Sequence, residues 1–243
     1  MNRDDTNPAQ DAGARPPGAG VAAPEAGGLA ARLRGFGPAW LVSFLLILAG
    51  SFVFIGLNGV LVLLWRWLSR TPWSEIGYVR PKSWTRAILL GVVVGAAFKL
   101  AMKSVVMPLL GADPVNHAYH YLAGNRAAVP GFIFALVFGA GFGEEMVFRG
   151  YLFERLGRLL GKTRAARVAT VMIGAALFGA AHYANQGVAG VEQAAITGLA
   201  FGAVYAATGS LAGIMIAHVA FDLTAYAIIY RDLETTVAHW FFR

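Results

Sequence analysis

Three carboxylates and two histidines of this chain stand inside long apolar stretches, where ionisable side chains are rare. They are Glu144, Glu145, Asp222, His182 and His218, and Arg149 lies close to the first two. An ionisable group in the hydrocarbon region of a membrane is costly unless it is paired or hydrated. The other ten of the thirteen acidic residues lie in loops, near the ends of these stretches or before residue 38. We therefore expect the chemistry of the chain at these six positions.

The spacing of the first three of these residues separates an ion pair from a free acid. Glu145 precedes Arg149 by four residues, which is the favoured order for an ion pair on one helix face. We interpret these two as a mutually neutralising pair that stabilises the site. Glu144 is rotated by about 100° from Glu145 on a helix and shares Arg149 less easily. An unpaired carboxylate in a low-dielectric place suits the role of a general base.

Counting residues from the loops places the polar groups at similar depths. Glu144 lies sixteen residues before Leu160, and His182 lies sixteen residues after Ala166, and a short connection at 161–165 joins these two stretches. In an antiparallel helical hairpin both side chains would reach about 24 Å from that connection. His218 and Asp222 are four residues apart and share one face of a third helix. We expect groups from three helices to meet in one site.

Such a set could hydrolyse an amide without a serine or cysteine nucleophile. Glu144 and His182 at one depth can hold and activate a water between them. His218, oriented by Asp222 or by another neighbour, can donate a hydrogen bond to an oxyanion. The same residue types also line proton relays and transporter sites, and spacing alone leaves that interpretation open.

Composition excludes most classes of soluble protein. The chain of 243 residues is 57% hydrophobic and 14% charged, and its mean hydropathy is +0.58. Soluble domains are about 45–50% apolar and about 25% charged. A disordered polypeptide, a nucleic-acid-binding domain and an ordinary cytosolic enzyme are thereby excluded. Because there is no cysteine, disulfides, thiolate zinc sites and a cysteine nucleophile are excluded as well.

Six apolar stretches are long enough to cross about 30 Å of hydrocarbon as helices. They run over 39–66, 87–110, 129–160, 166–183, 191–208 and 211–230. We predict an all-α fold, a polytopic transmembrane helical bundle of about six spans in residues 38–243, with the functional core at 129–230. The third stretch predicts one helix of about 45 Å that carries Glu144 near its middle. Residues 1–37, which contain no apolar run, are predicted to form a flexible N-terminal arm.

Basic residues determine the predicted orientation. The loops after the first and third stretches hold ten of the twenty Lys and Arg residues, so both loops are predicted to face the cytoplasm. With a single span before the first of these loops, the N-terminal arm would lie on the opposite side of the membrane. Lys99 and Lys103, in the second stretch, are expected to extend toward the outer interface.

Three motifs, in chain order, resemble those of a known family. Glu144 to Arg149 reads as EExxxR, Phe178 to His182 as FxxxH, and His218 to Asp222 as HxxxN or HxxxD. Residues 129–230 resemble the CPBP family of intramembrane proteases, which comprises CAAX proteases such as the Ras-converting endopeptidase and bacteriocin-processing enzymes. The resemblance implies a multi-pass integral membrane endopeptidase.

The resemblance also implies a role for each motif. Glu144 and His182 match the two residues that activate water in the family. His218 and the residue four positions later match a pair that stabilises the oxyanion. Glu145 and Arg149 match the second acid and the base of the first motif, which support the site.

The third motif of this chain departs from the eukaryotic pattern. Where eukaryotic members usually carry Asn, this chain has Asp222. A carboxyl group donates no hydrogen bond unless it is protonated. Asp222 would therefore orient His218 or help to bind a cation.

The cofactor implied by the resemblance is open. Members of the family have been described both as metalloproteases and as metal-independent glutamate proteases. Glu144, His182 and His218 would supply ligands for zinc, although no HExxH spacing is present. We favour a water activated without a metal ion and keep zinc as the alternative.

The predicted partners are the lipid bilayer and a peptide or protein substrate, with or without a lipid modification, and no nucleic acid. Two other functions would use the same polar cluster: a transporter or proton-coupled carrier, and a non-catalytic peptide-binding or immunity protein. Transporters often repeat a pair of interrupted spans in their two halves, and the sequence contains no matching pair.

Overall fold

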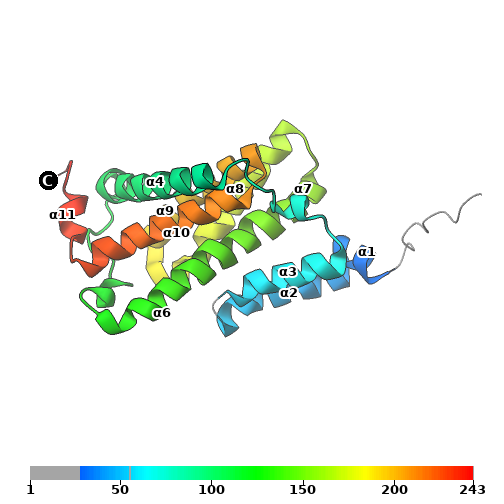
Figure 1. Ribbon diagram of the computed structural model, residues 1–243, viewed down its shortest axis with the longest axis horizontal. Helices are drawn as coiled ribbons and strands as arrows, with labels where there is room; N and C mark the ends of the chain where they lie inside the picture. The colour runs from blue at the N-terminus through cyan, green and yellow to red at the C-terminus, as the bar shows by residue number, and fades with distance from the viewer. Residues whose placement is uncertain (1–27, 55, 243) are drawn as a thin grey trace, which may run out of the picture.

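The computed structural model describes residues 28–54 and 56–242, which form helices and loops without a β-strand. The helices are α1 (Leu29–Arg34), α2 (Pro38–Val53), α3 (Leu57–Ser69), α4 (Trp84–Ala101), η2 (Met102–Val106), α5 (Met107–Leu109), α6 (Val129–Phe134), η5 (Ala135–Glu144), η6 (Met146–Leu152), α7 (Phe153–Leu160), α8 (Arg164–Ala181), α9 (Tyr183–Thr208), α10 (Leu211–Tyr230) and α11 (Glu234–Ala238). Three short turns of 3₁₀-helix are η1 (Trp73–Ile76), η3 (His120–Leu122) and η4 (Arg126–Ala128). The predicted all-α class is confirmed (Figure 1).

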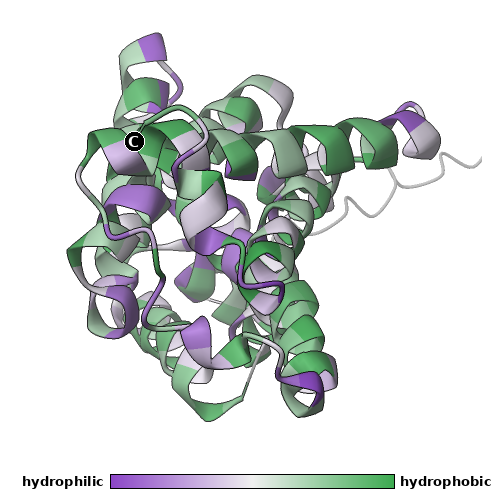
Figure 2. Ribbon diagram, turned by 90° about the vertical axis from the view of Figure 1, so that its left-hand side faces the viewer, coloured by the Kyte–Doolittle hydropathy of each residue, from purple (hydrophilic) through white to green (hydrophobic). Residues whose placement is uncertain are grey.

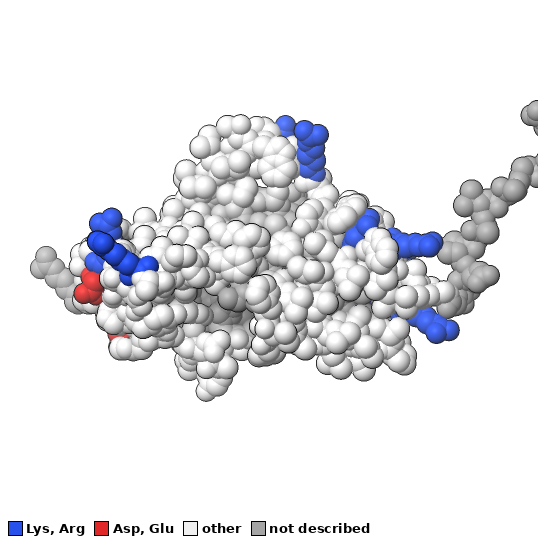
Figure 3. Space-filling model, turned by 60° about the horizontal axis from the view of Figure 1, so that its bottom comes forward, with Lys and Arg blue, Asp and Glu red and all other residues white. Residues whose placement is uncertain are grey.

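Among the described residues, five helical stretches are long and apolar enough to cross a membrane. They are Trp84–Leu109, Arg126–Leu160, Arg164–Ala181, Tyr183–Thr208 and Leu211–Tyr230. Figure 2 shows hydrophobic residues along most of the helix lengths, with hydrophilic residues gathered at the loops. On the face shown in Figure 3, charged side chains stand near the edges and the middle is uncharged. Exposed apolar side chains such as Val93 and Leu89 therefore face lipid, and the protein is a multi-pass membrane protein.

The longest stretch, Arg126–Leu160, forms one helix as predicted for 129–160. Its middle consists of the π-helical segments η5 and η6, which meet at Glu144 and Glu145. A π-helix places its backbone hydrogen bonds five residues apart and occurs mostly as short insertions at functional sites. The two acids thus sit about halfway along the helix, at its change from one π-segment to the next.

The prediction of a single span over 39–66 is wrong. The segment forms a hairpin of two helices, α2 with 16 residues and α3 with 13, which are about 24 Å and about 20 Å long and too short for a 30 Å core. The chain reverses next to Gly56, whose φ of 80° favours glycine. The Asn58 side chain donates to the Ser51 hydroxyl (3.0 Å) and joins the two helices.

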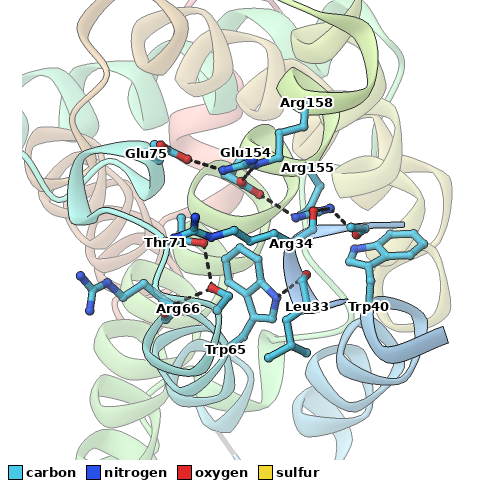
Figure 4. A network of polar contacts seen from close by, with 12 residues as sticks. Leu33, Arg34, Trp40, Trp65, Arg66, Thr71, Glu75, Glu154, Arg155 and Arg158 are labelled. Carbon is cyan, nitrogen blue, oxygen red and sulfur yellow. Dashed lines mark hydrogen bonds and ion pairs between the residues drawn. The ribbon is translucent and has the colours of Figure 1, made fainter. Parts of the chain in front are cut away.

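Because α2 and α3 form a hairpin, both ends of this segment lie at the same end of the molecule. Figure 4 shows α1 and the start of the loop after α3 beside α7. Arg155 of α7 donates to the carbonyl oxygens of Arg34 and Gly35, at 2.7 Å each, and the Trp65 indole donates to the carbonyl oxygen of Leu33 (3.3 Å). The predicted placement of the arm opposite the basic loops is therefore wrong for residues 28–37.

The predicted flexible arm, 1–37, is only partly covered by the structure. Residues 1–27 lie outside the described residues. Residues 28–37 contain α1, which the composition of the segment did not predict, and Leu33 of this helix is buried against the hairpin.

Two glycines on α4 let this helix approach α10 closely. A Cβ at Gly95 would overlap the carbonyl oxygen of Ala217, and a Cβ at Gly91 would stand 2.7 Å from a methyl carbon of Ile216. Small residues four apart allow such close backbone contact in membranes. Since His218 follows Ala217 directly, this contact also sets the distance between α4 and the polar face of α10.

We expect the substitution Gly95→Ala to reduce stability, because the added methyl group meets backbone that cannot rotate away. Overpacking of this kind costs about 1–3 kcal/mol. The measurement is the free energy of unfolding in detergent micelles. Gly213→Ala on α10 is the matched control, because a Cβ there meets no atom within 4 Å; equal losses for both variants would contradict the close contact.

Candidate active site

The polar residues predicted from the sequence lie on three stretches of helix. Glu144 ends η5 and Glu145 follows it, so both belong to the long helix Arg126–Leu160. His218 and Asp222 lie one turn apart in α10. His182 stands between α8 and α9. The close contacts of each group show how these stretches meet.

Glu145 is the centre of a buried network. Its Oε1 accepts hydrogen bonds from Arg149 Nη1 (2.8 Å) and from His218 Nδ1 (2.7 Å). All three side chains are almost completely buried. The Arg149 guanidinium also lies over the Phe178 ring, 4.6 Å from its centroid, which favours a cation. The pair predicted between Glu145 and Arg149 is thus present, and it holds His218 in addition.

This network fixes the orientation of the His218 ring. A carboxylate can only accept, so the proton of this hydrogen bond is on Nδ1. The other nitrogen, Nε2, points toward the second glutamate and the aspartate: it lies 3.9 Å from Glu144 Oε2 and 3.6 Å from Asp222 Oδ2. Both distances exceed a hydrogen bond. Glu145, rather than Asp222, is therefore the residue that orients His218.

Glu144 and Asp222 differ from Glu145 in their access to solvent. The side chain of Glu144 is 30% exposed and that of Asp222 is 22% exposed, whereas that of Glu145 is fully buried. No hydrogen bond joins Glu144 to another described side chain. A carboxylate that is reachable and free of a strong partner can accept a proton from water.

His182 lies at the end of a helix rather than inside one, which corrects the prediction from the apolar stretch 166–183. It follows the last residue of α8, and its Nδ1 donates to the carbonyl oxygen of Phe178 (2.8 Å). Because a carbonyl oxygen only accepts, Nδ1 carries the proton and Nε2 keeps a free lone pair.

An aromatic ring separates the two histidines. The centroid of the Phe178 ring lies 4.7 Å from that of His182 and 6.1 Å from that of His218, both edge-on. Phe178 and His182 are four residues apart, as FxxxH requires. Phe178 is part of the sequence motif. Its contact with both imidazoles could not be predicted from the motif, because it depends on how α8 packs against the long helix and α10.

Two further residues near the site were missed by the sequence analysis. Tyr119, in the loop before α6, accepts a hydrogen bond from Gln186 (3.4 Å). Burial raises the pKa of the Tyr119 hydroxyl, and the charges of Glu144 and Asp222 raise it further. It therefore stays protonated as a donor beside these acids. No signal in the sequence links a loop tyrosine to residues 25 or more positions later.

Lys99 is the second of these residues. The expectation that it extends toward the outer interface is wrong, because the side chain is only 6% exposed and its Nζ donates to Gln193 Oε1 (2.8 Å). Lys103, one turn later, bonds to the Pro114 carbonyl oxygen and lies 3.7 Å from Glu234. Both lysines thus belong to the interior at this end of the bundle.

The donor atoms do not form a metal site in this arrangement. Among the described residues, no three His, Asp or Glu side chains converge to hold one ion. His218 and His182 each use Nδ1 in a hydrogen bond, to Glu145 and to the Phe178 carbonyl oxygen, so Nε2 is the ring atom of each that could bind a metal ion. Only the lack of convergence among the described side chains speaks against a metal site. The ligand set Glu144, His182 and His218 therefore does not fit zinc as the residues stand, and no step is assigned to a metal here.

Comparison with known proteins identifies the segment that carries these residues. Residues 126–224 match the family model of Rce1-like type II CAAX prenyl endopeptidases. The segment similar to the Rce1-like CAAX protease family thus comprises 99 of the 243 residues. The match agrees with the resemblance found at 129–230, and it contains Glu144, His182, His218 and Asp222. No curated protein and no solved structure is significantly similar to the chain. Similarity to an integral membrane family agrees with the five long apolar helices found among the described residues.

We expect Arg149→Met to destabilise the fold strongly, because it leaves the Glu145 carboxylate buried without its cation. Removing one partner of a buried ion pair costs about 3–5 kcal/mol. The free energy of unfolding in micelles is the measurement.

The control for this variant is Glu75→Gln, which breaks the half-exposed pair between Glu75 and Arg158 (2.6 Å). Exposed pairs contribute about 0–1 kcal/mol. Similar losses for the two variants would show that Glu145 is not buried as described.

Proposed function

We propose that the chain is an intramembrane endopeptidase that hydrolyses a peptide bond with a water activated by Glu144 and His182. The family of residues 126–224 indicates endopeptidase activity. The observation that carries the finer proposal is that Glu144, from the long helix, faces His218 of α10 at 3.9 Å while Glu145 holds the far side of the same imidazole.

In this mechanism the reacting water lies next to the exposed carboxylate of Glu144. Its oxygen attacks the carbonyl carbon of the scissile amide, and its proton passes to Glu144. The free Nε2 of His182 accepts a hydrogen bond from the same water. When the C–N bond breaks, Glu144 returns the proton to the leaving nitrogen, so no covalent intermediate with the enzyme forms.

Negative charge on the carbonyl oxygen is stabilised by His218. Nδ1 is held by Glu145, and the carboxylates of Glu144 and Asp222 near Nε2 favour the doubly protonated ring, so Nε2 carries a hydrogen that can be donated. A fixed donor in a site shielded from water is worth more than the same donor in solution. Asp222 thus contributes charge rather than a hydrogen bond to the oxyanion.

The substrate proposed is a peptide or protein segment at the membrane, with or without a lipid modification. An apolar groove of about 610 Å³ between α4, η5 and α10 runs beside the site, lined by Gly141, Val219 and Leu223 among others. Each of these lies within four residues of Glu144, His218 or Asp222 in the sequence, and the apolar lining suits a substrate segment that approaches from the bilayer.

We expect Glu144→Gln and His182→Ala each to reduce peptide cleavage by roughly 10²–10⁴-fold, since each removes a group that handles the proton of water. Cleavage is measured with purified protein in liposomes by mass spectrometry of the products. Asp232→Asn, in the turn after α10, is the control with unchanged cleavage. Wild-type turnover in either of the first two variants would refute the mechanism.

Whether a metal ion takes part in hydrolysis can be tested separately. We expect purified active protein to contain less than one equivalent of any transition metal and to keep its activity in a chelator, because the ligands do not converge. Elemental analysis and the rate of cleavage with and without chelator are measured on the same sample. A stoichiometric metal whose removal stops cleavage would replace the proposed activation of water by one that uses zinc.

A further inference from the structure

The hairpin of α2 and α3 packs against the long helix at the residue that precedes Glu144. A Cβ at Gly143 would stand 2.5 Å from Asn58 Oδ1 and 3.3 Å from the Cα of Gly56. A Cβ at Gly59 would stand 3.1 Å from the Cα of Gly143. Protein interiors are close-packed, and these distances leave no room for a side chain between Gly143 and the hairpin. The start of α3 and the long helix therefore meet one residue before the proposed base.

On its other side, the same stretch of the long helix touches α10. A Cβ at Gly141 would overlap a methyl group of Val219, and Val219 directly follows His218 in the sequence. Because Gly141 and Gly143 are two residues apart, they lie on roughly opposite faces of the helix. The backbone before Glu144 is thus clamped between the hairpin and the helix that carries His218.

The clamped stretch has an unusual backbone. The segment η5 is π-helical over 10 residues and ends at Glu144, whereas π-helix is rare and occurs mostly as single turns. Sparsely populated backbone conformations persist only where the surrounding structure holds them. The position of Glu144 therefore depends on the groups that pack against η5.

Asn58 is the polar side chain of the hairpin at this contact, and both ends of its amide are held. Its Nδ2 donates to the Ser51 hydroxyl (3.0 Å), and its Oδ1 accepts from the backbone nitrogen of Gly59 (2.7 Å). The residue is only 7% exposed. A Cβ at Gly50 would stand 3.1 Å from the Asn58 nitrogen, so α2 also packs closely against its backbone. The Asn58 amide is therefore fixed in place where it meets Gly143.

We propose that Asn58 is a positioning residue for hydrolysis, which holds Glu144 in its place beside His218 through the contact with Gly143. This inference rests on the proposed role of Glu144 as the base. The separation at stake is the 3.9 Å between Glu144 Oε2 and His218 Nε2, and misplacing a reacting group by about 1 Å can slow a reaction about 100-fold. Asn58 lies outside residues 126–224, which match the family model. The active site would then include an element that the matched segment does not contain.

The first experiment measures kcat, KM and the free energy of unfolding for Asn58→Ala. We expect kcat to fall roughly 10- to 100-fold while KM stays within about twofold of the wild-type value. Ser69→Ala is the matched control, because Ser69 is buried in the same helix, bonds to Thr71 (2.8 Å) and lies about 16 Å from Asn58 along the axis. It should lose stability and keep its kcat. Wild-type kcat in Asn58→Ala would overturn the proposal.

Gly143→Ala tests the same contact from the long helix. Its added methyl group meets Asn58 Oδ1 and should displace the backbone before Glu144, so kcat should fall. Combining it with Asn58→Ala removes the atom that the methyl group meets, and the double variant should be more active than Gly143→Ala alone. Losses that simply multiply in the double variant would show that the two residues act independently and would overturn the proposal.

A third measurement does not depend on hydrolysis. Since the chain contains no cysteine, Glu144→Cys introduces a single thiol, and its rate of reaction with a water-soluble maleimide reports its accessibility and surroundings. Adding Asn58→Ala should change this rate at least about threefold, and adding Ser69→Ala should not. This result, together with no hydrolysis by the wild type, would support the positioning role and refute the protease. An unchanged rate would overturn the positioning role, and hydrolysis that stops in Glu144→Gln would still support the protease.

Discussion

The double hydrogen bond accepted by Glu145 is the interaction on which the rest of the site depends. One carboxylate oxygen binds both Arg149, on its own helix, and His218 on α10. Taking ions out of water costs several kcal/mol each, and the mutual attraction offsets this cost only when the geometry is good. The long helix and α10 therefore cannot slide past each other without exposing an unpaired charge. The close contact of Gly95 with Ala217 holds α10 on its other side.

Two adjacent glutamates acquire opposite properties from this arrangement. Neighbouring residues of a helix point in different directions, so Glu145 faces the bundle interior while Glu144 faces the accessible space beside His218. The first is paired and ionised, which makes it a poor base but a good anchor. The second has no strong partner and is within reach of water. The functional difference between them arises from their surroundings and not from their chemistry.

Much of this site follows from the sequence, because helices convert residue spacing into position. The four-residue intervals between Glu145 and Arg149 and between His218 and Asp222 predicted shared faces, and counting from the connection at 161–165 predicted a common depth. The role of Glu145 as the partner of His218 did not follow, since 73 positions separate the two residues. Only the packing of two helices decides which acid reaches the imidazole.

Two of the predictions that the structure corrects, the single span over 39–66 and the outward extension of Lys99, have a related origin. Hydropathy averaged along the chain does not include the positive φ of Gly56 or the hydrogen bond from Asn58 to Ser51, so it predicts one span where the chain forms a hairpin. In the same way, a lysine in an apolar stretch is expected to extend to the interface unless another helix supplies an acceptor. Gln193 supplies one, 94 positions away. The hairpin and the buried lysine both depend on specific polar contacts. Average hydropathy over a short segment of sequence does not include such contacts.

Asp222 lies close both to the proposed reacting groups and to the buried Lys99. Its carboxylate is 3.6 Å from His218 Nε2, and the ring of the preceding residue, Phe221, packs against the Lys99 ammonium. Where an asparagine would offer its amide nitrogen as a hydrogen-bond donor, this chain places a third carboxylate, after Glu144 and Glu145, beside one imidazole. Arg149 and Lys99 are buried cations on two helical stretches that pack against α10. With a neutral residue at 222, the buried Lys99 would have no acid on the side of the reacting groups. The aspartate and the buried lysine are therefore best understood together, as opposite charges that bring this part of the interior nearer to neutrality than either would alone.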